Sequence, residues 1–149
     1  MPNIIELSSS ALNQTSKLQN AIDYLERHGG GRLRLLPGDH MSGSIRLCSH
    51  LVLELMPGAN LKALGKPELF PAYSHSEHSR MDVYPWPAFI FGLQLENVTL
   101  EGGGTIDGGG LHPCFQNGID NSSQRPYGIH FVKSKRICVR DLFLMISAF

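Results

Sequence analysis

The pattern of hydrophobic and polar positions separates one short helical segment from a long series of short strands. In residues 16–28 the hydrophobic residues recur at helical spacing and share one face, namely Leu18, Ala21, Ile22 and Leu25. Ser16 and Gln19 fit a capping box at its start, and three consecutive glycines follow its end. The pattern predicts a short amphipathic helix that must cover an apolar surface elsewhere in the molecule.

Beyond the three glycines the pattern changes to short alternating or apolar runs that end at glycine, proline or asparagine. The predicted strands are Arg32–Leu35, Ser44–Leu47, Leu51–Leu55, Asn60–Leu61, Phe89–Phe91, Val98–Glu101, Thr105–Ile106, Ile129–Val132, Ile137–Val139 and Leu142–Leu144. Residues 66–87 interrupt this series and are rich in Pro, His, Ser and Tyr. We interpret them as a long loop, the kind of segment that often carries binding residues.

Three of the predicted strands open with the same pattern, in which a polar residue precedes alternating apolar positions. The three units begin at His50, Asn97 and Arg136, which lie 47 and 39 residues apart. Repeats on this scale indicate stacked units, none of which can bury its apolar side alone. A parallel coil and the blades of a propeller would both give such spacing. Glycine-rich corners and very short strands favour the coil, with residues 16–28 capping its first strand edge.

Several glycine-centred motifs follow one another in order along the chain. They are residues 18–23, 29–31, 36–43 and 47–61, then Gly104-Thr105-Ile106-Asp107-Gly108, and finally Arg125-Pro126 and residues 147–149. From about residue 14 onward this series resembles the opening of the polygalacturonases, glycoside hydrolase family twenty-eight. The resemblance implies that the family motifs include Gly104, Thr105, Ile106, Asp107, Gly108, Arg125 and Pro126, and that these residues have a structural function.

The resemblance implies an all-β fold, a right-handed single-stranded parallel β-helix, in which residues 1–149 form the first coils of one domain. It also implies inverting hydrolysis of O-glycosidic bonds in a pectic polysaccharide or oligogalacturonide, built of galacturonan or rhamnogalacturonan. The family's Asn-x-Asp, Asp-Asp, Gly-His-Gly and Arg-x-Lys motifs do not occur here, and Asn117 and Asp120 have the wrong spacing for the first. We therefore expect an inactive N-terminal fragment that lacks the catalytic coils.

Aromatic and basic side chains are the candidates for substrate binding. Tyr73, Tyr84 and Trp86 in the predicted loop could stack on sugar rings, or they could clamp the loop to the coil. Four basic residues, Lys133, Lys135, Arg136 and Arg140, could attract a polyuronate, or they could form a solvated edge. The substrate-binding candidates carried forward are Tyr84, Trp86, Lys133 and Arg136.

Other reactive side chains are given structural interpretations. Asp107 is expected to bond backbone amides at a glycine-rich turn. Four scattered acids are interpreted as surface charge, namely Asp82, Glu96, Glu101 and Asp120. No metal site is expected at His75-Ser76-Glu77-His78, which lacks a third ligand. Cys48 and Cys138 are expected to be small buried residues.

Composition and charge exclude several classes of protein. Thirteen Lys and Arg balance thirteen Asp and Glu, so nothing indicates a nucleic-acid binder. No apolar run approaches membrane-spanning length, and three cysteines without a CxxC pair predict neither a disulfide framework nor a cofactor. No secretory signal is visible, so a cytoplasmic setting is expected by default, or a secreted or periplasmic one if the N-terminus is incomplete.

Two rivals to the hydrolase remain. One is a carbohydrate-binding or structural β-helix without chemistry, which includes a truncated gene product. The other is a pectate lyase on the same fold, which would need calcium-binding clusters of acids that this sequence does not show. The oligomeric state is not predicted.

Overall fold

The computed structural model describes residues 3–71, 87–109 and 126–145. Its elements are β1 (Ile4–Leu7), α1 (Thr15–Arg27), β2 (Gly31–Leu35), β3 (Gly38–Ser42), β4 (Ile45–Arg46), β5 (Leu51–Leu55), β6 (Ala59–Ala63), the 3₁₀ turn η1 (Pro67–Leu69), β7 (Ala88–Leu93), β8 (Glu96–Glu101), β9 (Thr105–Asp107), β10 (Tyr127–Val132), β11 (Lys135–Val139) and β12 (Phe143–Met145). Every predicted strand has a counterpart here, although several bounds differ by a few residues.

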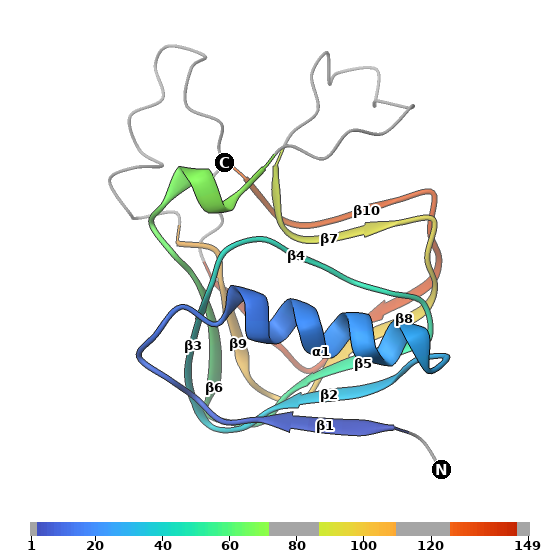
Figure 1. Ribbon diagram of the computed structural model, residues 1–149, viewed down its shortest axis with the longest axis horizontal. Coiled ribbons are helices and arrows are strands. Elements are labelled where there is room, and N and C mark those ends of the chain that lie inside the picture. The colour runs from blue at the N-terminus through green and yellow to red at the C-terminus, as the bar shows by residue number, and fades with distance from the viewer. Residues whose placement is uncertain (1–2, 72–86, 110–125, 146–149) are drawn as a thin grey trace.

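The strands form three parallel sheets, which the chain visits in turn (Figure 1). Sheet A has the order β1-β2-β5-β8-β11, sheet B the order β3-β6-β9-β12, and sheet C the order β4-β7-β10. One passage through sheets A, B and C is one coil, and each strand pairs with the strands of the coils before and after it. This is the stacked parallel coil that the repeat predicted, and not a propeller.

Aliphatic side chains of successive coils stack inside the molecule. In sheet A, Leu53 pairs with Leu33 on one side and with Leu100 on the other, and all three are fully buried. In sheet C, Ile90 likewise pairs with Ile45 and Ile129. Burial of each such side chain contributes about 1.5–3 kcal/mol, so the interior rows hold the coils together.

The predicted helix is confirmed, and it closes the first coil. Its four predicted apolar residues are all buried, and α1 packs against β2 and β4. The predicted capping box is wrong, because α1 has no side-chain cap from Ser16. Instead, Oδ1 of Asn13 accepts hydrogen bonds from the backbone N–H and the hydroxyl of Thr15.

Residues before and within α1 also cover the strand edges of the first coil. Strand β1 pairs with β2 in sheet A. In sheet B, the N–H of Gln14 donates to the carbonyl of Met41 at 2.8 Å. In sheet C, the side-chain amide of Gln19 accepts from the N–H of Arg46 at 2.8 Å and donates to its carbonyl at 3.0 Å. Gln19 therefore acts as a short substitute for a neighbouring strand, which protects the edge of β4.

Replacing Gln19 by alanine should lower the free energy of unfolding by about 1–2 kcal/mol, since two hydrogen bonds to the backbone are lost at a partly solvated edge. Chemical denaturation followed by circular dichroism would measure the change. Lys17→Ala, on the exposed face of the same helix, is the matched control and should change stability by less than about 0.5 kcal/mol. Equal effects of the two substitutions would show that Gln19 does not protect the edge.

Two strands were not predicted, β1 and β3. In β3 the side chains that face the interior are polar, because His40 and Ser42 are both fully buried. Both ring nitrogens of His40 lie within hydrogen-bond distance of an oxygen inside the coil, Nδ1 at 2.9 Å from Gln14 Oε1 and Nε2 at 2.7 Å from the carbonyl of Leu36. The expected burial of the cysteines holds for Cys48 but is wrong for Cys138, which is exposed.

The repeat begins at a corner of the coil. His50, Asn97 and Arg136 all have left-handed backbone conformation, with φ of 59°, 57° and 55°. Their side chains touch: Nδ2 of Asn97 lies 3.3 Å from Nδ1 of His50, and Nε of Arg136 donates to Oδ1 of Asn97 at 2.7 Å. We call these three residues the corner ladder. Gly30, with φ of 108°, holds the equivalent corner one coil earlier.

Candidate functional site

The connections from sheet B to sheet C vary in length, and the two longest connections between the strands are among them. Residues 43–44 make this connection in the first coil, residues 64–87 in the second and residues 108–126 in the third. The last two connections end side by side, because the N–H of Tyr127 donates to the carbonyl of Pro87 at 2.9 Å. The described ends of both connections therefore lie at the same corner, where β7 and β10 begin.

Ring side chains of β7 and β10 contact one another in sheet C. Phe91 pairs with Arg46 in one neighbouring strand and with His130 in the other. Phe91 is only 1% exposed, and the imidazole of His130 meets its ring edge-on, with centroids 6.0 Å apart. The ring of Tyr127 lies 4.9 Å from that imidazole. The Phe91 ring therefore supports the imidazole of His130 from within, while Tyr127 and His130 are only half-buried.

Four of the sequence candidates lie outside the described residues, namely Tyr73, Tyr84, Trp86 and Arg125. The chain nevertheless fixes where they attach. Tyr84 and Trp86 belong to the connection that enters β7, and Arg125 to the connection that enters β10. Pro126, which follows Arg125, is buried.

Lys133 and Arg136 lie at the opposite end of sheet C, where the chain turns into sheet A. Lys133 directly follows β10, so a six-residue strand of about 20 Å separates it from the other corner. Arg136 is bound to Asn97, and its guanidinium also contacts the carboxylate of Glu96. Lys133 and Arg136 therefore lie at the other end of β10 from Tyr127, whose N–H bonds to Pro87, the last residue of the predicted loop.

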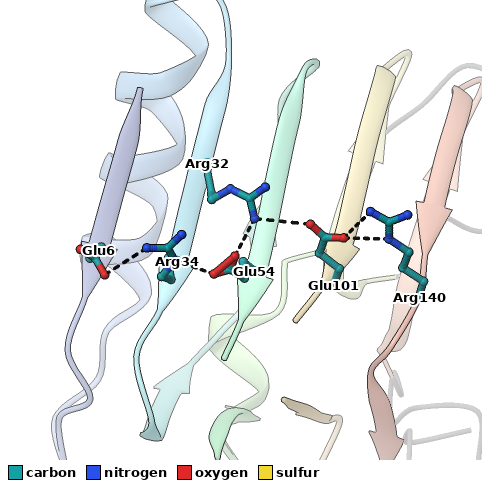
Figure 2. A network of polar contacts seen from close by, with 6 residues as sticks. All are labelled: Glu6, Arg32, Arg34, Glu54, Glu101 and Arg140. Atoms are coloured by element: carbon teal, nitrogen blue, oxygen red, sulfur yellow. Dashed lines mark hydrogen bonds and ion pairs between the residues drawn. The ribbon is translucent and has the colours of Figure 1, made fainter. Parts of the chain in front are cut away.

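Of the four acids considered in the sequence, Glu101 belongs to a charge network on the outer face of sheet A (Figure 2), and Glu96 contacts Arg136 and Lys135. The six members of the network come from the neighbouring strands β1, β2, β5 and β8 and from the residue that follows β11; they are Glu6, Arg34, Glu54, Arg32, Glu101 and Arg140. Nη1 of Arg32 lies 2.6 Å from Glu54 and 3.4 Å from Glu101, and so bridges two carboxylates. Arg140 completes the network with contacts of 2.6 and 2.7 Å to Glu101.

Glu54 and Glu101 are a closely spaced acid pair, because they are register partners in β5 and β8. Inverting hydrolysis needs one protonated carboxyl and a second carboxylate about 6.5–9.5 Å away, whereas paired strands are only about 4.8 Å apart. The hydrogen bond from Arg140 also holds the pKa of Glu101 below its ordinary value. Glu101 therefore stays ionised and cannot donate a proton at neutral pH, which makes this network structural.

The network should make stability depend on pH. A carboxyl whose pKa is lower in the folded state stabilises the fold above its unfolded pKa of about 4.3 and loses that contribution as the pH falls through its folded value. Asp39 adds to the effect, since hydrogen bonds from Asn60 and Lys62 lower its pKa as well. We expect the melting temperature to fall between pH 5 and pH 3.

Glu101→Gln should remove part of that pH dependence and lower the melting temperature at pH 7. Glu26→Gln, on the exposed face of α1, is the control and should leave the whole pH profile unchanged. Thermal melts at a series of pH values give the comparison. Parallel profiles for Glu101→Gln and the original chain would contradict the assigned role of the network.

The glycine motif at residues 104–108 also proves to be structural. A Cβ atom at Gly104 would lie 2.6 Å from Cβ of Leu55, so only glycine permits the two coils to approach this closely. Ile106 is buried, and Oδ1 of Asp107 accepts a hydrogen bond from the N–H of Gly109 at 2.9 Å. The bond agrees with the predicted turn role of Asp107.

Metal ligands and membrane helices are not found in the described part of the chain. Among residues 3–71, 87–109 and 126–145, no three His, Cys, Asp or Glu side chains gather in a way that could hold a metal ion. His75, Glu77, His78, Asp82 and Asp120 lie outside these ranges. The same described residues include no helix that is long and apolar enough to cross a membrane.

Comparison with known proteins gives a consistent picture. No family model matches the chain. The chain is 32% identical over 142 residues to a protein of Vitis vinifera named "Probable polygalacturonase", a match that covers 89% of the chain and 29% of the relative. The chain thus spans less than a third of the length of that curated relative.

Solved structures share the fold. A family 28 exopolygalacturonase of Yersinia enterocolitica superimposes with a TM-score of 0.80 at 17% identity, over 100% of the chain and 36% of the enzyme. A hyperthermoactive exopolygalacturonase of Thermotoga maritima gives a TM-score of 0.77 at 18% identity, over 99% of the chain and 44% of the enzyme. The fold is therefore the right-handed parallel β-helix that the sequence predicted, and the predicted resemblance to polygalacturonases is confirmed.

Proposed function

We propose that this polygalacturonase-like chain forms the first coils of an enzyme that hydrolyses O-glycosidic bonds of pectic chains with inversion. The observation that carries the proposal is the sequence similarity to the Vitis vinifera protein, which extends over 89% of the chain. The substrate would be a galacturonan or rhamnogalacturonan polysaccharide or oligosaccharide. The described ends of the two long connections, Pro87 and Tyr127, are hydrogen-bonded to each other where β7 and β10 begin, which is compatible with a shared binding corner.

In this proposal the corner between sheets B and C contributes one wall of the substrate groove. Tyr84 and Trp86, near the end of the connection into β7, would stack on sugar rings. Lys133 and Arg136, at the far end of sheet C, would act on a polyuronate through long-range attraction rather than direct contact. The charge of Arg136 is partly balanced by Glu96.

The 149-residue chain by itself should not hydrolyse pectic polymers. Glu101 is held ionised by Arg140, and Asp107 is engaged in a turn, so neither can serve as the general acid. A reducing-sugar assay with purified chain on polygalacturonate and on rhamnogalacturonan should give the rate of the protein-free blank. Turnover by the pure chain would overturn this prediction and would require catalytic carboxylates within residues 1–149.

A carbohydrate-binding or structural β-helix without chemistry is the second candidate function. The observation in its favour is the charge network, in which Glu54 and Glu101 are bound by arginines and unavailable for proton transfer. Reading the DNA beyond the codon of Phe149 separates the two functions. An in-frame continuation with Asn-x-Asp and Asp-Asp motifs supports the enzyme, whereas a stop codon at that point supports the binding or structural protein.

A further inference from the structure

A pocket of about 460 Å³ opens beside the outer face of sheet A, where β1, β2 and β5 begin. Its lining residues are Asn3, Ile4, His28, Gly29, Gly30, Gly31, Arg32, His50 and Val52. The volume lies within the range of about 300–1,000 Å³ that is usual for small-ligand sites. None of these described lining residues is acidic. The pocket adjoins sheet A rather than the corner between sheets B and C, so it is separate from the proposed substrate groove.

The hydrogen bonds of His28 fix which of its ring nitrogens carries the proton. Nδ1 lies 2.7 Å from the carbonyl oxygen of Tyr24, which can only accept. Nδ1 must therefore be protonated, and in the neutral ring Nε2 is a hydrogen-bond acceptor. The imidazole also stacks on the ring of Tyr24 at a centroid distance of 4.1 Å, which holds its orientation.

His50 has the opposite tautomer, and the corner ladder determines it. Nε of Arg136 can only donate, so the atom of Asn97 that it contacts at 2.7 Å must be the amide oxygen. The amide nitrogen of Asn97 therefore faces Nδ1 of His50, at 3.3 Å, and donates to it. In the neutral ring of His50 the proton then resides on Nε2, which is a hydrogen-bond donor.

We propose that this pocket binds a sugar ring through two of its hydroxyl groups. The pocket offers one imidazole acceptor from His28 and one imidazole donor from His50, and a pair of hydroxyls can satisfy both, because each hydroxyl donates and accepts. A metal ion fits less well, since a coordinating nitrogen must be unprotonated and only His28 offers one. Ile4 and Val52 supply apolar surface for the carbon face of the ring.

The glycine turn at residues 29–31 leaves space for the sugar ring in the pocket. A Cβ atom at Gly29 would meet no atom within 4 Å, so the wall at this position is open. Arg32 contributes little extra charge, because its Nη1 already bridges Glu54 and Glu101. We therefore expect neutral and acidic sugars to bind alike, which distinguishes recognition of hydroxyls from recognition of a carboxylate.

Equilibrium dialysis of the chain against radiolabelled galactose and galacturonate tests the proposal, and the method counts bound sugar per chain whatever the oligomeric state. We expect saturable binding of one sugar per chain, with similar affinity for both. His50→Asn and His28→Phe should each weaken binding about three- to tenfold, the effect of one lost hydrogen bond. Asparagine suits position 50 because Asn97 already occupies the same left-handed corner in the next coil.

Lys62→Ala, on sheet B, is the control and should bind as the original chain does. Absence of saturable binding, or binding that survives both histidine substitutions, would overturn the proposal. A strong preference for galacturonate that is lost in Arg32→Lys would also overturn the proposal, because a carboxylate would then be the recognised group. The site does not depend on the proposed hydrolase function, and sugar bound here without any hydrolysis would still confirm it.

Discussion

Replacing Gly30 by alanine should destabilise the chain by about 2–5 kcal/mol, whereas the same substitution at Gly29 should cost only about 1–2 kcal/mol. Both glycines have positive φ, 108° and 83°, so alanine is strained at either position by about 1–2 kcal/mol. Only at Gly30 would the new Cβ also collide with the next coil, since it would lie 2.3 Å from the carbonyl oxygen of His50. Crowding of this kind adds about 1–3 kcal/mol.

Urea denaturation of the two variants, followed by far-ultraviolet circular dichroism, measures the difference. Because the backbone strain is nearly the same in both, the excess loss in Gly30→Ala reports how tightly the first two coils stack at the corner. If the two variants lose equal stability, the close approach of Gly30 to His50 does not contribute to the fold.

The chain should associate with itself in solution, because its last coil exposes apolar side chains. In the described residues β10, β11 and β12 each pair on one side only. Phe143 and Leu144 are 68% and 59% exposed, and Leu144 lies in register with the buried Ile106 of the preceding coil. Unpaired edges next to apolar surface favour pairing with another chain. Light scattering after gel filtration should give a mass that rises with concentration above the 16.4 kDa of one chain.

Leu144→Lys should shift this association toward the monomer, since an inward-pointing charge on an edge strand opposes pairing. The control is Leu12→Lys, which changes a leucine that is 75% exposed near the helical cap, before α1. It should leave the measured mass unchanged. A single sharp melt of a monodisperse monomer in the original chain would contradict the prediction.

The sequence was informative wherever one residue position recurs in each coil. His50, Asn97 and Arg136 could be aligned from sequence because each occupies the same corner, and their spacing then matched the observed pairing of Val98 with Ile137 and of Leu53 with Leu100. The helix was predictable for a similar reason, since the apolar face of α1 is uninterrupted.

Strand β3 could not be predicted from hydrophobic periodicity, because its interior positions are His40 and Ser42, whose polar atoms lie within hydrogen-bond distance of oxygen atoms inside the coil. Nor could the role of Gln19 be read from the sequence, since its partner Arg46 comes close only after the coil has formed. The motif around Asp107 indicated a turn correctly, but which of Glu6, Glu54 and Glu101 meets which arginine depends on strand register, and no local pattern specifies that register.

The placement of the long connections has a consequence for how such a protein can change over time. Sheets A and B follow one another through short, nearly constant corners, while residues 43–44, 64–87 and 108–126 differ greatly in length at one equivalent position. Segments of different length and composition can therefore be exchanged there without disturbing the winding beneath them. Diversification of ligand preference would need only local insertions and deletions, and the inherited scaffold would not have to be redesigned.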